Sequence, residues 1–218
     1  NIRNSRVQGT GLIARTLASL KKKPRVLISA SAIGYYGSPG DKELTEDADV
    51  GHGFLAGVCR DWEAATESAQ ECGIRVIHLR IGIVLSTEGG GLAKMLPVFK
   101  MGMGGKVGNG KQYMSWITLT DVVKALRFAI VTENVQGPIN LTAPSPVTNH
   151  AFTKSLGRAL GRPTIFPMPA FAARLAFGEM ADELLLSSAR VLPRKLIASG
   201  FDFTHAELDD ALRAVLTP

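Results

Sequence analysis

The sequence predicts an α/β fold in which a doubly wound parallel sheet is joined by a small, mostly helical C-terminal lobe. Two apolar runs rich in β-branched residues, 25–32 and 75–85, are typical of strands covered on both faces of a parallel sheet. A helical pattern separates them, and further alternations of strand and helix follow, as in βαβ units. These strands alone make a short sheet, so we expect the first βαβ half of the fold to lie outside this sequence.

The first half of the chain alternates between helix and strand. An N-terminal helix is stopped by Pro24. The strand at 25–31 runs into Gly34–Gly40, a loop rich in turn-forming residues, and then into an acidic stretch. A helix over 53–72 places apolar residues on one face and leads into the strand at 75–85.

The second half continues the alternation with shorter strands and ends in helices. Strands are predicted at 113–119 and 139–142, and Thr120 is expected to cap the helix that follows the first of them. Thr204 and Glu207 form the pattern of a capping box at the start of the last helix. The helices predicted in this half cover 92–99, 121–132, 148–160, a segment beginning at Pro169, and 204–216.

Composition excludes several classes of function. Hydrophobic residues make up 45% of the chain and charged residues 20%, and no apolar run reaches the ~20 residues that span a bilayer. The net charge of +6 is local, because residues 1–25 contain seven basic and no acidic residues. These basic residues do not alternate with aromatic ones, so we expect neither nucleic acid nor a membrane as a partner. Cys59 and Cys72 are too far apart on one helix for a disulfide, which indicates a reduced, cytoplasmic protein.

The sequence shows neither a metal-binding pattern nor a known phosphate-binding loop. The four histidines are scattered and no Cys-x-x-Cys pair occurs, so no metal is expected. Gly89–Gly91 lacks the spacing of a dinucleotide-binding fingerprint and is predicted to be a flexible turn between a strand and a helix. Gly102–Gly110 lacks the ending of a Walker loop, and we expect it to be a mobile loop over a pocket.

Hydroxyl groups gather where the first predicted strand ends. Open parallel sheets bind ligands outside the carboxyl ends of their strands, so a crevice is expected there. Ser29 and Ser31 either bind an oxygen of a substrate or cofactor at this crevice or simply end the strand. Tyr35 and Tyr36 either donate a proton to a carbonyl, if a nearby cation lowers the phenol pKa, or only line the crevice.

Arg80 is the one charged residue inside the apolar run 76–85. A buried guanidinium requires hydrogen-bonding partners of opposite charge. These partners are either a phosphate or an acidic side chain, for which Glu63 and Asp61 are the candidates.

A series of motifs, in a fixed order, makes the chain resemble a known family. The motifs are Ser5-Arg6-x-x-x-Thr10, Ser31-Ala32-Ile33-Gly34-Tyr35-Tyr36-Gly37, Asp61-Trp62-Glu63, Leu79-Arg80-Ile81-Gly82-Ile83-Val84-Leu85, Gly89-Gly90-Gly91, Ser115-Trp116-Ile117-x-x-x-Asp121, Ala143-Pro144, Gly178-Glu179-Met180 and Gly200-Phe201-x-Phe203. Together they resemble the atypical extended short-chain dehydrogenase/reductases of the nucleoside-diphosphate-sugar epimerase-like family, including that family's C-terminal domain of unknown function. The resemblance covers essentially the whole chain.

The resemblance implies a Rossmann-like fold that binds NADP(H) or NAD(H), with its Gly-rich fingerprint in an N-terminal portion outside this chain. It divides the chain into a truncated NAD(P)-binding domain, 1–143, and a substrate-side helical lobe, 144–218. The residues that would contact the nicotinamide by family position are Ser29, Ala30, Ser31, Arg80, Ile81, Gly82 and Ile83. Those that would line the substrate side are Tyr36, Met95, Phe99 and Trp116.

The chain departs from the family of extended reductases at three functional positions. Leu55 and Cys59 stand about where those enzymes carry Tyr-x-x-x-Lys, so the usual proton relay is absent. Met114 stands where sugar-nucleotide epimerases carry an Arg that grips the diphosphate. An apolar carbonyl compound therefore fits this chain better than a sugar nucleotide.

Two functions follow from the resemblance and these departures. The first is an NAD(P)(H)-dependent epimerase or oxidoreductase that acts on a carbonyl or carbinol of a small, apolar substrate. In it Ser31 orients the oxygen, and Tyr35 or Tyr36 replaces the missing acid. The second is a non-catalytic NADP(H)-binding sensor or interaction module. The expected partners are the nucleotide cofactor, a small-molecule substrate and, in a homodimer, a second copy of the chain.

Overall fold

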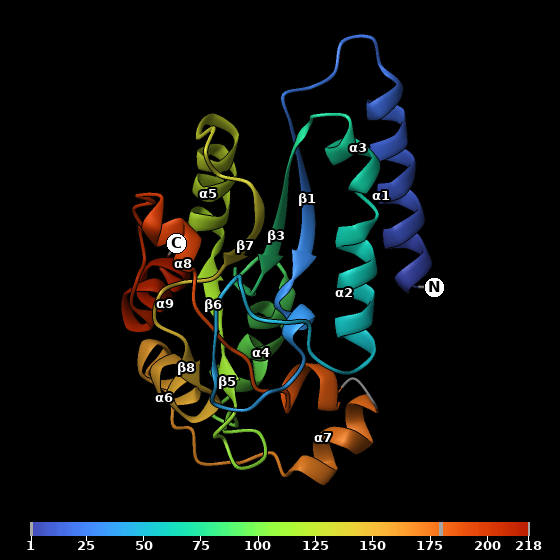
Figure 1. Cartoon of the computed structure of the whole chain (residues 1–218). Helices are drawn as coiled ribbons and strands as arrows, with labels where there is room; N and C mark the ends of the chain where they lie inside the picture. The colour runs from blue at the N-terminus through green and yellow to red at the C-terminus, as the bar shows by residue number, and fades with distance from the viewer. Residues whose placement is uncertain (1, 179–180, 218) are drawn as a thin grey trace.

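A computed structural model describes residues 2–178 and 181–217 and confirms the predicted α/β fold (Figure 1). A 3₁₀ turn, Ile33–Tyr36, directly follows the first strand, and a π-helical turn covers Ala181–Leu185. The strands are β1 (Val26–Ala32), β2 (Glu43–Leu44), β3 (Arg75–Ile81), β4 (Ile83–Leu85), β5 (Tyr113–Met114), β6 (Trp116–Thr118), β7 (Gly137–Leu141), β8 (Val147–Thr148) and β9 (Arg190–Val191). The helices are α1 (Ile2–Ser19), α2 (Phe54–Ala64), α3 (Glu67–Glu71), α4 (Gly90–Lys100), α5 (Leu119–Val131), α6 (Asn149–Leu160), α7 (Ala170–Phe177), α8 (Arg194–Ala198) and α9 (Leu208–Leu216).

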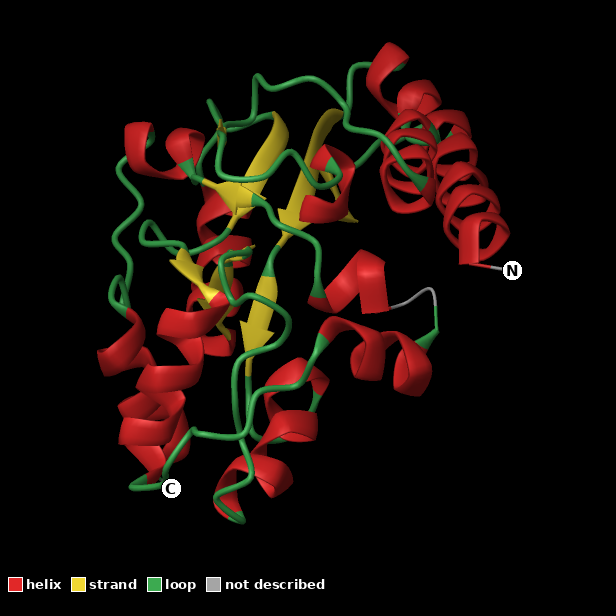
Figure 2. Ribbon diagram, turned by 90° about the horizontal axis from the view of Figure 1, so that it is seen from below, coloured by secondary structure: helices red, strands yellow, loops and turns green. Residues whose placement is uncertain are grey.

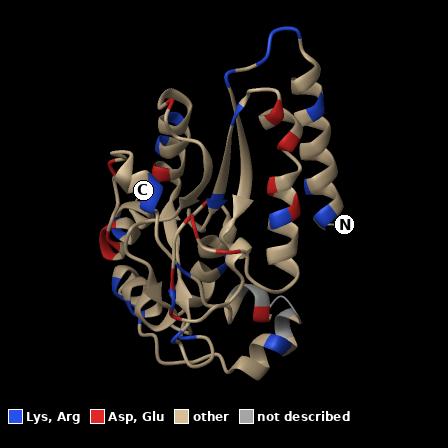
Figure 3. Cartoon of the chain, viewed as in Figure 1, with Lys and Arg blue, Asp and Glu red and all other residues tan. Residues whose placement is uncertain are grey.

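The central sheet consists of β1, β3 and β7, hydrogen-bonded in that order and all parallel. Ser31 on β1 pairs with Arg80 on β3, and Arg80 pairs with Asn140 on β7. The strands therefore end side by side, as predicted, and Figure 2 views them from the side toward which β1 and β3 point. The basic turn between α1 and β1 lies at the other end of these strands (Figure 3). Its charge therefore does not contribute to the crevice.

Gly82 divides the predicted strand 75–85 in two. Before it, β3 pairs with β7; after it, β4 pairs with β6. The backbone changes partner because Gly82 N donates to Leu141 O (3.1 Å) while Ile83 N donates to Ser115 O (2.8 Å). A Cβ at residue 82 would lie 2.5 Å from Ser115 O, so this close approach requires glycine. The prediction of one continuous strand is wrong at this residue.

Helices cover both sides of the sheet and bury apolar clusters against it. α2 and α3 pack beside β1 and β3 with α1 outside them, while α8 packs beside β7 and α5 beside β4 and β6 (Figure 1). The two larger clusters combine side chains from both sides of residue 143: Leu196 and Phe201 belong to one, and Leu208 and Leu212 to the other. The domain division at residue 143 stays a prediction, and the hydrophobic core does not follow it.

The predicted helix 53–72 is interrupted between α2 and α3. The Thr66 hydroxyl donates to Glu63 O (2.8 Å) and shares a hydrogen bond with His78 Nε2 (2.8 Å). Ser and Thr side chains that bond to nearby backbone compete with helical hydrogen bonds, which explains the break. His78 is buried, so it is a satisfied core residue as predicted, and burial lowers the pKa of its imidazole.

The helix caps in the second half differ from those predicted. α5 begins at Leu119, two residues earlier than predicted, because the Thr118 hydroxyl rather than that of Thr120 accepts from the backbone N–H of Asp121 (3.2 Å). The capping box at Thr204 does not form, because Asp121 Oδ1 accepts the Thr204 N–H (2.8 Å) instead. The buried Asp121 carboxylate thus fastens the C-terminal segment to the start of α5.

The cysteines and the helix lengths agree with what the sequence predicts for the described residues. Both cysteines are free thiols, Cys59 buried and Cys72 exposed. No helix within 2–178 and 181–217 has the length and apolar character needed to cross a bilayer. A hydrogen bond also joins α1 to α2, in which Trp62 Nε1 donates to the Thr10 hydroxyl (2.9 Å).

Candidate functional site at the carboxyl ends of the strands

A buried polar network lies beneath the carboxyl ends of the central strands. Neighbouring strands deliver Ser31, Arg80 and Asn140 to the same level of the sheet, because these residues are paired in register. Glu63 reaches them from α2, and Tyr36 from the turn after β1. We call these five residues the sheet-end network.

Arg80 is held by Glu63, which confirms one of the two acidic partners considered from the sequence. Its Nε and Nη2 atoms donate to the two carboxylate oxygens of Glu63, each at 2.9 Å. This two-point geometry suits a planar guanidinium in a buried site. The other candidate, Asp61, instead accepts from Arg3 and Arg60 on the surface.

Tyr36 closes the network on the opposite side of the guanidinium. Arg80 Nη1 donates to the Tyr36 hydroxyl (2.8 Å), which in turn donates to Asn140 Oδ1 (2.6 Å). The Tyr36 side chain is 2% exposed, and burial raises its pKa to about 12 despite the nearby Arg80 cation. Tyr36 is therefore a neutral phenol whose proton is already engaged, and this geometry favours a positioning role. Proton donation by Tyr36 stays a prediction.

Tyr35 covers the guanidinium of Arg80 with its ring. The guanidinium carbon lies 3.5 Å from the ring centroid, within the range of a cation–π contact. Tyr35 is half-buried and meets Tyr36 edge-on, with 5.4 Å between the ring centroids. Arg80 is 3% exposed, enclosed by Glu63, Tyr36 and this ring.

Sequence reasoning missed two members of this region, Glu46 and Asn140. Glu46 Oε1 accepts the backbone N–H groups of Asn140 (3.1 Å) and Lys195 (3.2 Å), so it joins β7 to α8. Its Oε2 atom is buried without a hydrogen-bond partner in the described part of the chain. An amide side chain within the apolar run 139–143 could have signalled Asn140, but Glu46 is one of several acids in its stretch and carries no such signal.

Ser31 is a buried member of the network, 3% exposed, at the end of β1. Its hydroxyl donates to Glu63 Oε1 (2.7 Å), so its lone pairs are left to accept a hydrogen bond from another group. The neighbouring face of α2 carries Leu55, which packs against Gly34, and Cys59. Burial raises the pKa of the Cys59 thiol, so Cys59 does not supply the positive charge of the missing Lys.

The remaining predicted site residues lie in different environments. Ser29 and Ala30 line a groove of about 170 Å³ along β1, the other lining residues being Thr10, Ile13, Leu27, Ile28 and Trp62. Ile81, Gly82 and Ile83 are half-buried where β3 passes into β4.

The side chains predicted to line the substrate side belong mainly to the core. Phe99 and Trp116 are buried in one apolar cluster, and Met95 packs half-buried at its edge. Trp116 also donates from Nε1 to Ser145 O (3.1 Å). Contact of these three residues with a substrate stays a prediction. Across residues 2–178 and 181–217, no group of three or more His, Cys, Asp or Glu side chains is arranged to hold a metal ion.

Comparison with known proteins gives consistent matches. Residues 168–215 match the model of a domain of unknown function, DUF1731. The chain is 48% identical over 212 residues to an epimerase family protein of Mycobacterium bovis, covering 97% of this chain and 70% of that protein. It is 37% identical over 217 residues to the epimerase family protein YfhF of Bacillus subtilis, covering 99% and 71%.

Solved structures agree with these matches. A crystal structure of the human epimerase family protein SDR39U1 (isoform 2) with NADPH superposes with a TM-score of 0.91 and 31% identity, covering 98% of this chain and 72% of that one. A nucleoside-diphosphate sugar epimerase from Corynebacterium glutamicum superposes with a TM-score of 0.80 and 38% identity, covering 99% and 42%.

Proposed function

Because this chain belongs to the epimerase family of atypical extended short-chain dehydrogenase/reductases, we propose that it binds NADP(H) or NAD(H) and oxidises or reduces a small substrate. The reacting group is a carbonyl or carbinol. The observation that carries this proposal is the register of β1, β3 and β7, which brings Ser31 and the Arg80–Gly82 segment to one edge of the sheet. Ligands of open parallel sheets bind at that edge.

The groups at this edge fit a flat nicotinamide ring. Ala30 is exposed, and Ile81, Gly82 and Ile83 are half-buried, so the accessible surface is small and apolar. The bound cofactor would supply or accept the hydride. The human relative with NADPH supports NADP(H) as the cofactor. Arg80 would not contact the cofactor phosphates, since it is 3% exposed and already paired with Glu63.

Ser31 would hold a hydrogen-bond donor of the substrate or cofactor. Because its own proton goes to Glu63, its oxygen can accept from a carbinol O–H or an amide N–H. Arg80 and Glu63 fix the position of that oxygen from below. Of the two tyrosines proposed as the acid, Tyr35 is the better placed, because it is half-buried whereas the Tyr36 proton is engaged by Asn140.

The substrate we propose is apolar rather than a sugar nucleotide. Met114, at the position of the diphosphate-binding Arg, is half-buried, and its sulfur accepts from Asn149 Nδ2 (3.5 Å). A thioether offers no positive charge to a diphosphate. Met95 would line the same side.

A specific feature favours a second candidate function, that of a non-catalytic cofactor-binding sensor. Leu55 and Cys59 occupy the face of α2 beside Ser31 and supply neither a phenol nor an ammonium group. Without them the proton relay of the extended reductases has no acid, and cofactor binding alone would remain.

Titration of the purified full-length protein with NADPH, followed by a panel of apolar aldehydes and ketones, tests both functions. Saturable binding with steady NADPH oxidation supports the enzyme, and binding without oxidation supports the sensor. Absence of NADPH and NADH binding contradicts both.

Ser31→Ala sharpens the test of the enzyme. It should lower kcat/KM about tenfold or more, because the acceptor that orients the reacting group is lost. Ser19→Ala, at the exposed end of α1, is the matched control and should leave kcat/KM unchanged. Equal turnover in both variants would remove the role assigned to Ser31.

A further inference from the structure

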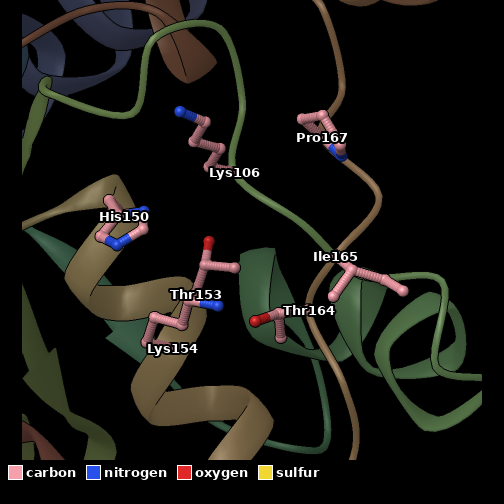
Figure 4. Close-up of a pocket in the computed structure, with 7 residues that line it drawn as sticks. All are labelled: Lys106, His150, Thr153, Lys154, Thr164, Ile165 and Pro167. Atoms are coloured by element: carbon pink, nitrogen blue, oxygen red, sulfur yellow. The ribbon is translucent and has the colours of Figure 1, made fainter.

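A hollow of about 150 Å³ lies between α6, the glycine-rich segment 102–110 and the segment 163–167 (Figure 4). It shares no lining residue with the sheet-end network. The residues that line it are Lys106, His150, Thr153, Lys154, Thr164, Ile165 and Pro167. No part of the function proposed above uses them.

The walls of this hollow are fixed by backbone hydrogen bonds. The backbone N–H of Val107 donates to Asn149 Oδ1 (2.8 Å), and that of His150 donates to Gly110 O (2.9 Å), which ties the glycine-rich segment to the start of α6. Met168 N donates to Lys106 O (2.9 Å) and joins the third wall. The segment predicted to be a mobile loop is therefore well anchored, and the hollow is preformed.

Thr153 is an unsatisfied polar group at the bottom of the hollow. Its side chain is 2% exposed, and its hydroxyl has no hydrogen-bond partner. In Figure 4 this hydroxyl points toward the space between Lys106 and His150. A buried hydroxyl without a partner destabilises a fold by about 1–3 kcal/mol, so such a group is a good indicator of a missing ligand.

The charge around the hollow has one sign. Lys106 and Lys154 come from different segments and both line the hollow, and no carboxylate lines it. Neither lysine forms an ion pair with a carboxylate in the described part of the chain. Two ammonium groups and a hydroxyl supply the donors that a phosphoryl group accepts.

We propose that this hollow binds the phosphoryl group of a small phosphorylated compound. The phosphoryl oxygens would accept from Lys106, Lys154 and the Thr153 hydroxyl. Ile165 and Pro167, on the opposite wall, would contact an apolar part of the same compound. Free phosphate and a phosphate monoester share this chemistry, and the apolar wall of Ile165 and Pro167 favours the monoester.

Isothermal titration with inorganic phosphate and with phenyl phosphate, at constant ionic strength, tests this site. Both should bind with a stoichiometry of one, and phenyl phosphate several-fold more tightly because its ring would bury against the apolar wall. The double variant Lys106→Met/Lys154→Met should bind both about tenfold more weakly or worse. Lys111→Met removes an exposed lysine from the same segment and should not change the affinity.

Thr153 variants separate a specific site from general attraction of anions. Thr153→Val should weaken binding several-fold at unchanged net charge, and Thr153→Ser should restore it. Absence of saturable binding, or equal loss in Lys111→Met, overturns the proposal.

NADPH affinity measured in the same variants distinguishes this proposal from the function proposed above. The double lysine variant should keep NADPH affinity. Loss of phosphate and NADPH binding together would assign the hollow to the cofactor site and overturn the inference.

Discussion

The sheet-end network and the hollow beside α6 both contain buried polar groups, but only one of them is complete. In the network, Arg80, Glu63, Tyr36 and Asn140 satisfy one another through hydrogen bonds of 2.6 to 2.9 Å. In the hollow, the Thr153 hydroxyl has no partner, and the two lysines have no counter-charge nearby.

This difference separates positioning from binding. Arg80 is 3% exposed and bonded to Glu63 and Tyr36, so it holds the strand ends in place. An unsatisfied hydroxyl between cations can gain hydrogen bonds only from something outside the chain. Mutation of a group that holds the fold should therefore lower the free energy of unfolding more than mutation of a group that binds a ligand.

Arg80→Met should have the largest effect. It leaves the buried Glu63 carboxylate without its counter-ion, which is expected to lower the free energy of unfolding by about 3–5 kcal/mol. Urea denaturation followed by circular dichroism measures this. Arg60→Met removes one of the two exposed partners of Asp61 and should leave the midpoint unchanged. Similar midpoints for the two variants would show that the network is not structural.

Gly82→Ala should rank second. The added Cβ would lie 2.5 Å from Ser115 O and 2.9 Å from the Thr142 methyl group, so the backbone must move at an expected loss of about 3 kcal/mol. Gly57→Ala, inside α2 with no atom within 4 Å of the new Cβ, should instead raise stability by about 0.5–1 kcal/mol. Thermal denaturation of both variants measures these opposite changes in stability. An unchanged melting temperature for Gly82→Ala would contradict the close approach of Gly82 to Ser115.

Tyr36→Phe should be milder, lowering the free energy of unfolding by about 1–3 kcal/mol at pH 7 because Asn140 and Arg80 each lose a partner. The difference from the wild type should shrink at high pH. Between pH 10 and 12 the unfolded wild type loses the phenol proton while the folded protein, whose Tyr36 pKa is about 12, keeps it, so the Tyr36 contribution falls as pH rises.

Urea denaturation of wild type and Tyr36→Phe at pH 7, 10 and 11.5 tests this pH dependence. Tyr35→Phe is the control, since it keeps the ring that covers Arg80. A difference that stays constant with pH would show that Tyr36 is not shielded as described. Full turnover by Tyr36→Phe on a substrate would confine Tyr36 to positioning.

Thr153→Val should have the smallest effect on stability. The hydroxyl has no partner, so its replacement by a methyl group of similar size should leave the melting temperature unchanged or raise it slightly. Differential scanning fluorimetry without phosphate measures this. A clear loss of stability would show that the hydroxyl is hydrogen-bonded within the protein. The hollow would then resemble the sheet-end network, whose polar groups bond to one another.

Sequence reasoning found the residues whose chemistry conflicts with their surroundings. A cation in an apolar strand identified Arg80, and Glu63 was one of its two candidate partners. It could not find Glu46 or Thr153. Glu46 lies among several other acidic residues and Thr153 in an amphipathic helix, so neither stands out from its neighbours in the sequence. It also extended one strand through Gly82, since an apolar run carries no sign of a change of partner.

The sequence by itself determined the α/β class, the parallel strands and the edge at which they end, because hydrophobic periodicity and turn residues act over short distances along the chain. Only the tertiary structure decided which polar groups are satisfied. Hydrogen bonds such as that between Tyr36 and Asn140, 104 residues apart, depend on distances that exist only after the strands have paired. The same packing left the Thr153 hydroxyl without a partner beside two lysines.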